Sequence, residues 1–235
     1  ALERQVEMLK SAGIDASYAF AYGIPSAEIN RLIGKGNYQF LVLGSHSKSM
    51  LEEVLLGSVA DSLISNLSVP ALLLKCKGKK PAVCPLVFSG KILFPTDFSD
   101  NAKAAFEILI SIIGNYNPTV TLYHVQNKDI ISPDLDYKIE EFNRIDTERL
   151  NKSKETLLRA GAKSVKIKIE TGYAKQAIID EINNSNYDLV VMGTQGRGWI
   201  EEVFLGDIAH AVIGKSNTSL LLVPFYGVLH FFFFI

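Results

Sequence analysis

The sequence is short of cysteine, of clustered positive charge and of long apolar runs. Its 235 residues include two cysteines, Cys76 and Cys84. These are too few for a disulfide framework, so we expect reduced thiols in a cytoplasmic protein. The net charge is −1 with no Lys/Arg block, which argues against the concentrated basic face of a nucleic-acid-binding protein. The apolar tail at 225–235 is far shorter than the ~20 residues of a membrane helix, so we expect no membrane span.

The chain contains a long internal repeat. Residues 22–75 align without a gap on residues 171–224, at an offset of 149, and 16 of the 54 aligned pairs are identical. The identical pairs include Gly44/Gly193 and Gly57/Gly206. Two copies at so long a period indicate a duplicated domain rather than a solenoid.

Each copy alternates strand patterns with helix patterns. The second copy predicts five strands with helices between them, the strands lying at 91–95, 119–125, 164–172, 189–193 and 219–223. This alternation implies right-handed crossovers and a parallel sheet. The first copy begins with the end of an amphipathic helix, continues with an extended stretch at 17–23, and predicts strands at 40–44 and 71–75.

The first copy lacks counterparts of the first two strands and the first helix. We therefore expect either that further residues precede Ala1 or that something else fills the gap. The expected segments are an incomplete first domain at 1–76, a linker at 77–88, a complete second domain at 89–224 and the apolar tail at 225–235.

Three glycines follow the buried strand at 189–193. Gly193, Gly196 and Gly206 lie in a loop that leads from the carboxyl end of a strand to the start of a helix. Free backbone N–H groups and the helix dipole make such a place a natural anion site, and glycine lets the backbone approach phosphate oxygens closely. The loop is neither a Walker A loop nor a dinucleotide fingerprint, and glycines after strands also serve simply as turns.

The spacing Gly193-x2-Gly196-x9-Gly206 resembles the nucleotide loop of the universal stress protein family. The stretch KILFPTDFSD at 91–100 and the strand ending LYHV at 122–125 are similar to the first two strands of its ATP-binding branch. The resemblance implies two flavodoxin-like or Rossmann-like α/β units with parallel five-stranded sheets and helices on both faces, the first incomplete at its N-terminus. It also implies dimer-like pairing of the last strands, which two-fold symmetry would make antiparallel.

The same resemblance implies a site for AMP or ATP, with or without Mg²⁺, on the second copy. Asp97 would contact the nucleoside, and the backbone of Val125 would face adenine. The implied nucleotide-binding residues are Pro95, Thr96, Asp97, Val125, Met192, Gly193, Thr194, Gly196, Arg197, Gly206, Asp207 and Ile208.

Each copy departs from the family pattern at a different place. The first copy has a degenerate loop with Gly44, Ser47, Gly57 and Ser58, in which serine replaces the second glycine. In the second copy Asp207 replaces the usual Ser or Thr. Its carboxylate would either cap the helix or occupy the anion site, and in the second case AMP should bind at least as well as ATP without metal.

We find no nucleophile–base pair, metal cluster or positioned lysine in the sequence. We therefore expect a stress-response or regulatory protein that acts by binding an adenine nucleotide, with a pseudo-dimer inside the chain and a homodimer as a further arrangement. The alternatives are a nucleotide-free scaffold of the same fold and a slow ATPase.

Overall fold

The computed structural model describes residues 2–45, 57–75, 88–127, 139–195 and 205–224. Both cysteines, the C-terminal tail and nearly all of the expected linker lie outside these ranges. The chain divides into two compact units, Ala1–Asn37 and Tyr38–Ile235, and each is described by itself.

The first unit contains two amphipathic helices. These are α1 (Leu2–Ser11) and α2 (Pro25–Lys35). Pro25 starts α2, a position where the missing N–H of proline costs no hydrogen bond. Residues 17–23 belong to no strand, although the matching stretch of the second copy is strand β5. A strand needs a neighbour, and no described residue ahead of 17–23 forms one.

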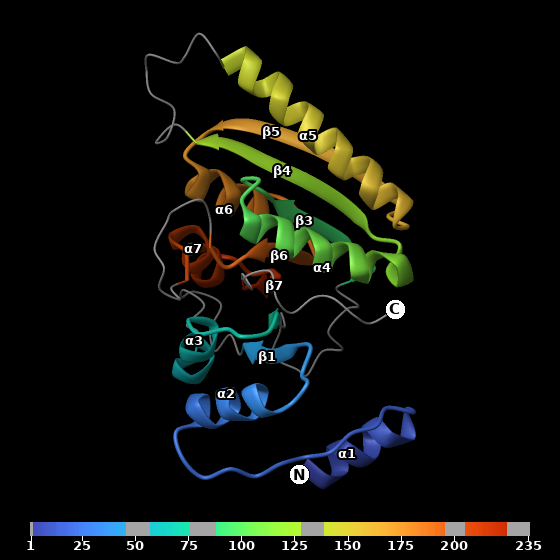
Figure 1. The fold of residues 1–235 in the computed structure, drawn as a ribbon, viewed down its shortest axis with the longest axis vertical. Coiled ribbons are helices and arrows are strands. Elements are labelled where there is room, and N and C mark those ends of the chain that lie inside the picture. The colour runs from blue at the N-terminus through green and yellow to red at the C-terminus, as the bar shows by residue number, and fades with distance from the viewer. Residues whose placement is uncertain (1, 46–56, 76–87, 128–138, 196–204, 225–235) are drawn as a thin grey trace. The chain divides into compact units, whose positions relative to one another are not determined.

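The second unit is built on one seven-stranded sheet (Figure 1), in the order β1-β2-β7-β6-β3-β4-β5. All neighbouring strands are parallel except β2 and β7, which are antiparallel. The strands are β1 (Leu41–Ser45), β2 (Ala71–Lys75), β3 (Lys91–Pro95), β4 (Thr119–Asn127), β5 (Ser164–Gly172), β6 (Leu189–Gly193) and β7 (Ser219–Val223).

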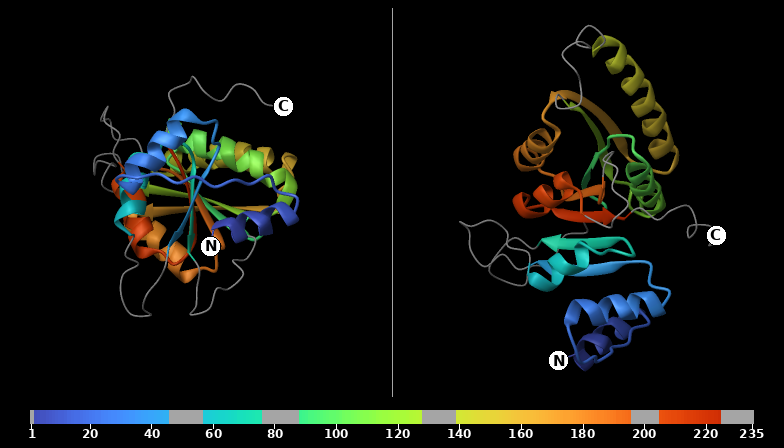
Figure 2. Two further views of the ribbon diagram at one scale, coloured as in Figure 1. Left: turned by 90° about the horizontal axis from the view of Figure 1, so that it is seen from below. Right: turned by 60° about the vertical axis from the view of Figure 1, so that its left-hand side comes forward.

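Helices cover both faces of this sheet, as Figure 2 shows for the second copy. The helices of the second unit are α3 (Ser58–Ile64), α4 (Asp100–Tyr116), α5 (Ile139–Arg159), α6 (Ala174–Asn184) and α7 (Asp207–Lys215). On one face, α4 and α5 pack against strand residues such as Phe94 and Leu122. On the other, α3, α6 and α7 pack against residues such as Leu93 and Val190. Alternate residues of one strand thus enter opposite cores, which explains the continuous apolar runs.

The strands of the second copy, β7-β6-β3-β4-β5, form the complete parallel five-stranded unit that the sequence predicts. The first copy adds β1 and β2. The two copies meet where β2 lies antiparallel to β7, with Leu72 opposite Leu221. This pairing confirms the prediction that the terminal strands of the two copies face each other. Both strands are rich in leucine, and pairing covers edges that would otherwise be exposed.

Within the described residues, no helix has the length and apolar character that crossing a membrane requires.

Candidate functional site

The turn between β3 and α4 is held by hydrogen bonds to β4 and within the turn itself. Thr96 N–H donates to the carbonyl of Tyr123 on β4 over 2.9 Å. The Asp97 carboxylate accepts from the backbone N–H of Ser99 at 3.0 Å, and the Ser99 side chain caps α4 by accepting from Ala102 N–H. Pro95 is buried and Thr96 to Ser99 are half-buried. Asp97 therefore sits on a defined turn at the carboxyl end of β3.

The backbone of Val125 faces this turn. The carbonyl of Tyr123 points toward β3, because it accepts from Thr96. Groups two residues apart on a strand point to the same side, so the N–H and carbonyl of Val125 also point toward the β3 side. They lie beyond Pro95, whose partner on β4 is Tyr123. The Val125 side chain is buried among residues that pack under α6 and α7.

The two ends of the glycine loop lie next to each other at the end of β6. Strand β6 ends at Gly193, and Thr194 N–H donates to the carbonyl of Val223 on β7. Gly206 N–H donates to the carbonyl of Thr194 over 2.7 Å, which closes the base of the loop. Met192 and Thr194 are buried, and Ile208 is half-buried at the start of α7. Gly196 and Arg197 lie outside the described residues.

Gly193 has a packing role that the sequence did not reveal. A Cβ atom added there would lie 3.0 Å from the carbonyl oxygen of Asn101 and 3.1 Å from the carbonyl carbon and Cβ of the same residue. Glycine at this position lets the first turn of α4 approach β6. No such neighbour lies within 4 Å of a Cβ added at Gly44, the counterpart in the first copy.

Asp207 does not cap helix α7. The N-cap residue is Gly206, which has no side chain to cap the helix, and the helix begins at Asp207. The carboxylate is 81% exposed and pairs with the ammonium group of Lys175 in α6. The hydrogen bond and the charge of Lys175 lower the pKa of Asp207. The interpretation of Asp207 as a helix cap is therefore wrong, and sequence reasoning missed its partner.

In the first copy, Gly57 is the N-cap of α3 and Ser58 begins that helix. Both are exposed, as is Gly44 in β1. Ser47 lies outside the described residues. No described residue of the first copy is a counterpart of Asp97, because the repeat begins after the first two strands.

The parallel pairing of β3 and β6 brings predicted residues together. Strands β3 and β6 are parallel neighbours, so the Asp97 turn and the base of the glycine loop lie at the same carboxyl edge of the sheet. A ligand at this edge could therefore contact both the turn and the start of α7. Among the described residues, no group of three or more His, Cys, Asp or Glu side chains could hold a metal ion.

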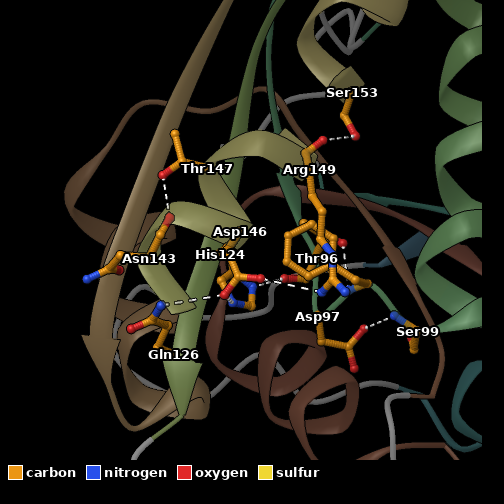
Figure 3. Close-up of polar contacts among 11 residues, drawn as sticks. Thr96, Asp97, Ser99, His124, Gln126, Asn143, Asp146, Thr147, Arg149 and Ser153 are labelled. Carbon is orange, nitrogen blue, oxygen red and sulfur yellow. Dashed lines mark hydrogen bonds and ion pairs between the residues drawn. The ribbon is translucent and has the colours of Figure 1, made fainter. Parts of the chain in front are cut away.

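A polar cluster beside the turn was not predicted (Figure 3). It joins the buried His124 and Gln126 of β4 to the half-buried Asp146 and the exposed Arg149 of α5. The only sequence signal was a histidine, His124, near the end of a predicted strand. No spacing rule connects a strand residue with a helix residue more than twenty positions later, so its partner Asp146 could not be identified.

Comparison with known proteins agrees with the fold and the repeat. Universal stress protein MJ0577 of Methanocaldococcus jannaschii is 32% identical over 152 residues, which cover 57% of this chain and 93% of that protein. A solved structure of the same protein has a TM-score of 0.51 at 29% identity and covers 60% of this chain and 99% of that chain. The structure of a universal stress protein from Archaeoglobus fulgidus has a TM-score of 0.71 at 26% identity, covering 95% of this chain and 76% of that one.

The universal stress protein family matches the chain twice, over residues 1–75 and 89–224. These two matches correspond to the two copies of the repeat and include most of the sequence. The chain belongs to the universal stress protein family.

Proposed function

We propose that the second copy binds an adenine nucleotide and that the protein acts through this binding rather than through catalysis. The observation that supports the proposal is the shared edge of β3 and β6. The Asp97 turn and the closed base of the glycine loop follow the carboxyl ends of these two strands, and Val125 lies on β4, the other neighbour of β3. The nucleoside would lie at Asp97 and Val125, and the phosphates would point toward the start of α7.

The first copy lacks half of this arrangement. It keeps Gly44, Gly57 and Ser58 but has no described counterpart of the Asp97 turn. We therefore propose that the nucleotide, AMP or ATP, binds to the second copy, with or without Mg²⁺. The binding would serve a regulatory or stress-response role in the cytoplasm.

The proposal is tested with Gly196→Val, which places a side chain in the phosphate space. Its matched control is Ser47→Val, the equivalent position in the first copy. At a ligand concentration 100 times the Kd, nucleotide should stabilise the wild type by about 2.7 kcal/mol. The control should behave like the wild type and Gly196→Val should lose the effect. No stabilisation of the wild type by ATP, ADP or AMP would favour a nucleotide-free scaffold instead.

Hydrolysis of ATP is the second candidate activity. Among the residues that would line the site, we identify no nucleophile paired with a base in the described part of the chain. Any hydrolysis should therefore be slow, and phosphate release by the purified protein with ATP and Mg²⁺ measures it. Turnover at or above about 1 s⁻¹, the low end for enzymes, would contradict a function based on binding alone.

A further inference from the structure

Asn101 carries a buried carboxamide beside the base of the glycine loop. It is the second residue of α4, whose N-cap is Ser99, and it is 8% exposed. A Cβ atom added at Gly193, the last residue of β6, would lie 3.1 Å from the Cβ of Asn101. Asn101 therefore lies where the glycine loop leaves the sheet.

The side-chain amide of Asn101 has no hydrogen-bond partner among the residues that the structure describes. Other buried polar side chains nearby do have partners. His124 contacts the carbonyl of Thr96, and Gln126 donates to the carboxylate of Asp146. A carboxamide offers two N–H donors and one acceptor oxygen, and most buried polar groups are hydrogen-bonded. A buried amide without a protein partner therefore points to a bound ligand or to water.

The amide extends toward the carboxyl edge of the sheet. Helix α4 follows β3 directly, so the N-terminal end of α4 lies at this edge. On a helix the Cα–Cβ bond is tilted toward the N-terminus, so the side chain of Asn101 leaves its Cβ in the direction of the edge. Because that Cβ packs beside Gly193, the amide extends past the end of β6 toward the base of the glycine loop.

The surroundings of this amide suit an anion. The first turn of α4 carries the partial positive charge of a helix N-terminus. Its acidic residue, Asp100, has a side chain that is 72% exposed and pairs with Lys103. Thr194, which follows Gly193, is 6% exposed, and its hydroxyl has no partner in the described part of the chain either. The base of the loop thus holds buried donors that the protein itself does not use.

The order of the strands identifies the part of the nucleotide that would lie at Asn101. Strand β6 is between β3 and β7 in the sheet. In the proposed binding mode the nucleoside contacts the turn after β3, and the terminal phosphates point toward the start of α7. Asn101, at the end of β6, is between these two places. The group expected there is the phosphate attached to the sugar, which AMP, ADP and ATP share.

We propose that Asn101 is a further ligand-binding residue of this site and that its carboxamide N–H groups donate to the phosphate attached to the sugar. A hydrogen bond to a charged oxygen is stronger than one between neutral groups, and it gives the buried amide the partner that it lacks. Asn101 would therefore favour nucleotides over nucleosides. The inference rests on the proposed nucleotide binding and names the part of the ligand that this residue recognises.

The test compares AMP with adenosine, which differ only in the phosphate group, by calorimetry on the full chain. The variants are Asn101→Leu, which keeps the branched shape of the side chain but removes its polar atoms, and Asn101→Ala, which removes the amide without added bulk. The control is Asn115→Leu, the same change at an exposed position near the other end of α4. Thermal unfolding without ligand measures whether the fold needs the amide.

Both Asn101 variants should bind AMP ~10-fold more weakly than the wild type, the factor expected for the loss of one hydrogen bond to a charged group. Their affinity for adenosine should stay at the wild-type value, and the control should match the wild type with both ligands. Without ligand, Asn101→Leu should unfold at a temperature no lower than that of the wild type, because it removes a buried polar group that has no partner.

Unchanged AMP affinity in both variants would overturn the inference and leave the proposed function intact. If Asn101→Leu also unfolded at a lower temperature, the amide would have a water-mediated structural role instead. An equal loss of affinity for AMP and adenosine would overturn the inference as well, because the amide would then not recognise the phosphate. A wild type that binds neither ligand would refute the proposed function and, with it, this contact.

Discussion

Lys75 connects the two copies through a half-buried ammonium group. It ends strand β2, and its Nζ donates to the carbonyls of Ile213 at 2.6 Å and Ser216 at 2.5 Å, at the carboxyl end of α7. The ammonium thus satisfies two carbonyls that the helix leaves without partners. Burial lowers the pKa of Lys75 from its ordinary value of 10.5 to about 8.

The sign of the resulting pH dependence follows from proton binding. Between the two pKa values the unfolded chain holds more protons on Lys75 than the folded protein, so the free energy of unfolding rises with pH. The contribution of Lys75 to the free energy of unfolding is complete above its pKa in the unfolded chain. It is lost as pH falls through its pKa in the folded protein. At 1.36 kcal/mol per pKa unit the full effect is about 3.4 kcal/mol, of which about 2.5 kcal/mol falls between pH 7 and pH 10. Both figures are upper bounds, because Lys75 keeps some exposure.

The assay is urea unfolding of the wild type and of Lys75→Met between pH 7 and pH 10. Methionine keeps most of the apolar stem and removes the charge. The wild-type free energy of unfolding minus that of the variant should increase by up to about 2.5 kcal/mol across this range. Tyrosines and other groups titrate in both proteins and cancel in the difference. A difference that stays constant from pH 7 to pH 10 would show that Lys75 is not buried as a charge at this junction.

Two further predictions concern the glycine loop and the start of α7. Gly193→Ala should lower the free energy of unfolding by about 1–3 kcal/mol, because Asn101 offers backbone rather than a movable side chain, whereas Gly44→Ala should change it by less than about 0.5 kcal/mol. Thermal unfolding of both variants checks this, and equal losses would contradict the packing role. Asp207→Ser should strengthen ATP binding a few-fold in metal-free buffer with little effect on AMP, and Lys175→Gln should weaken ATP. Calorimetry with and without Mg²⁺ measures these effects, and an unchanged ATP affinity in both variants would remove the pair from the site.

The sheet could be predicted because its signals are local or repeated. Apolar runs such as 189–193 identify buried parallel strands without knowledge of their neighbours. The duplication then predicts that the two copies meet through their terminal strands, because related copies pair through equivalent edges. The observed pairing of Ala71 in β2 with Leu222 in β7 agrees with this prediction. The extended stretch at 17–23 is different, because a strand exists only where a second strand accepts its hydrogen bonds.

The polar contacts of the candidate site could not be predicted, because they depend on register between distant elements. The sequence of helix α5 is charged and amphipathic, but its pattern does not show that Asp146 would turn inward to His124. Lys75 stands at the end of an apolar strand, and its counterpart in the second copy is Pro224, so the repeat gave no hint of a capping role. Such contacts become visible only when the elements are placed side by side.

Comparison of the two copies explains why Asp207 should be considered together with Lys175. At the two equivalent positions the first copy has Ser58 and Ser26, so the second copy carries opposite charges where the first has two hydroxyls. The paired residues leave the net charge at the start of the helix unchanged, and the lysine offsets the repulsion that a lone carboxylate would exert on phosphates. Because Asp207 is largely exposed, solvent screens the remaining effect. The substitution of serine by Asp207 is therefore compatible with nucleotide binding at this edge of the sheet, and its influence should be on the choice among phosphates.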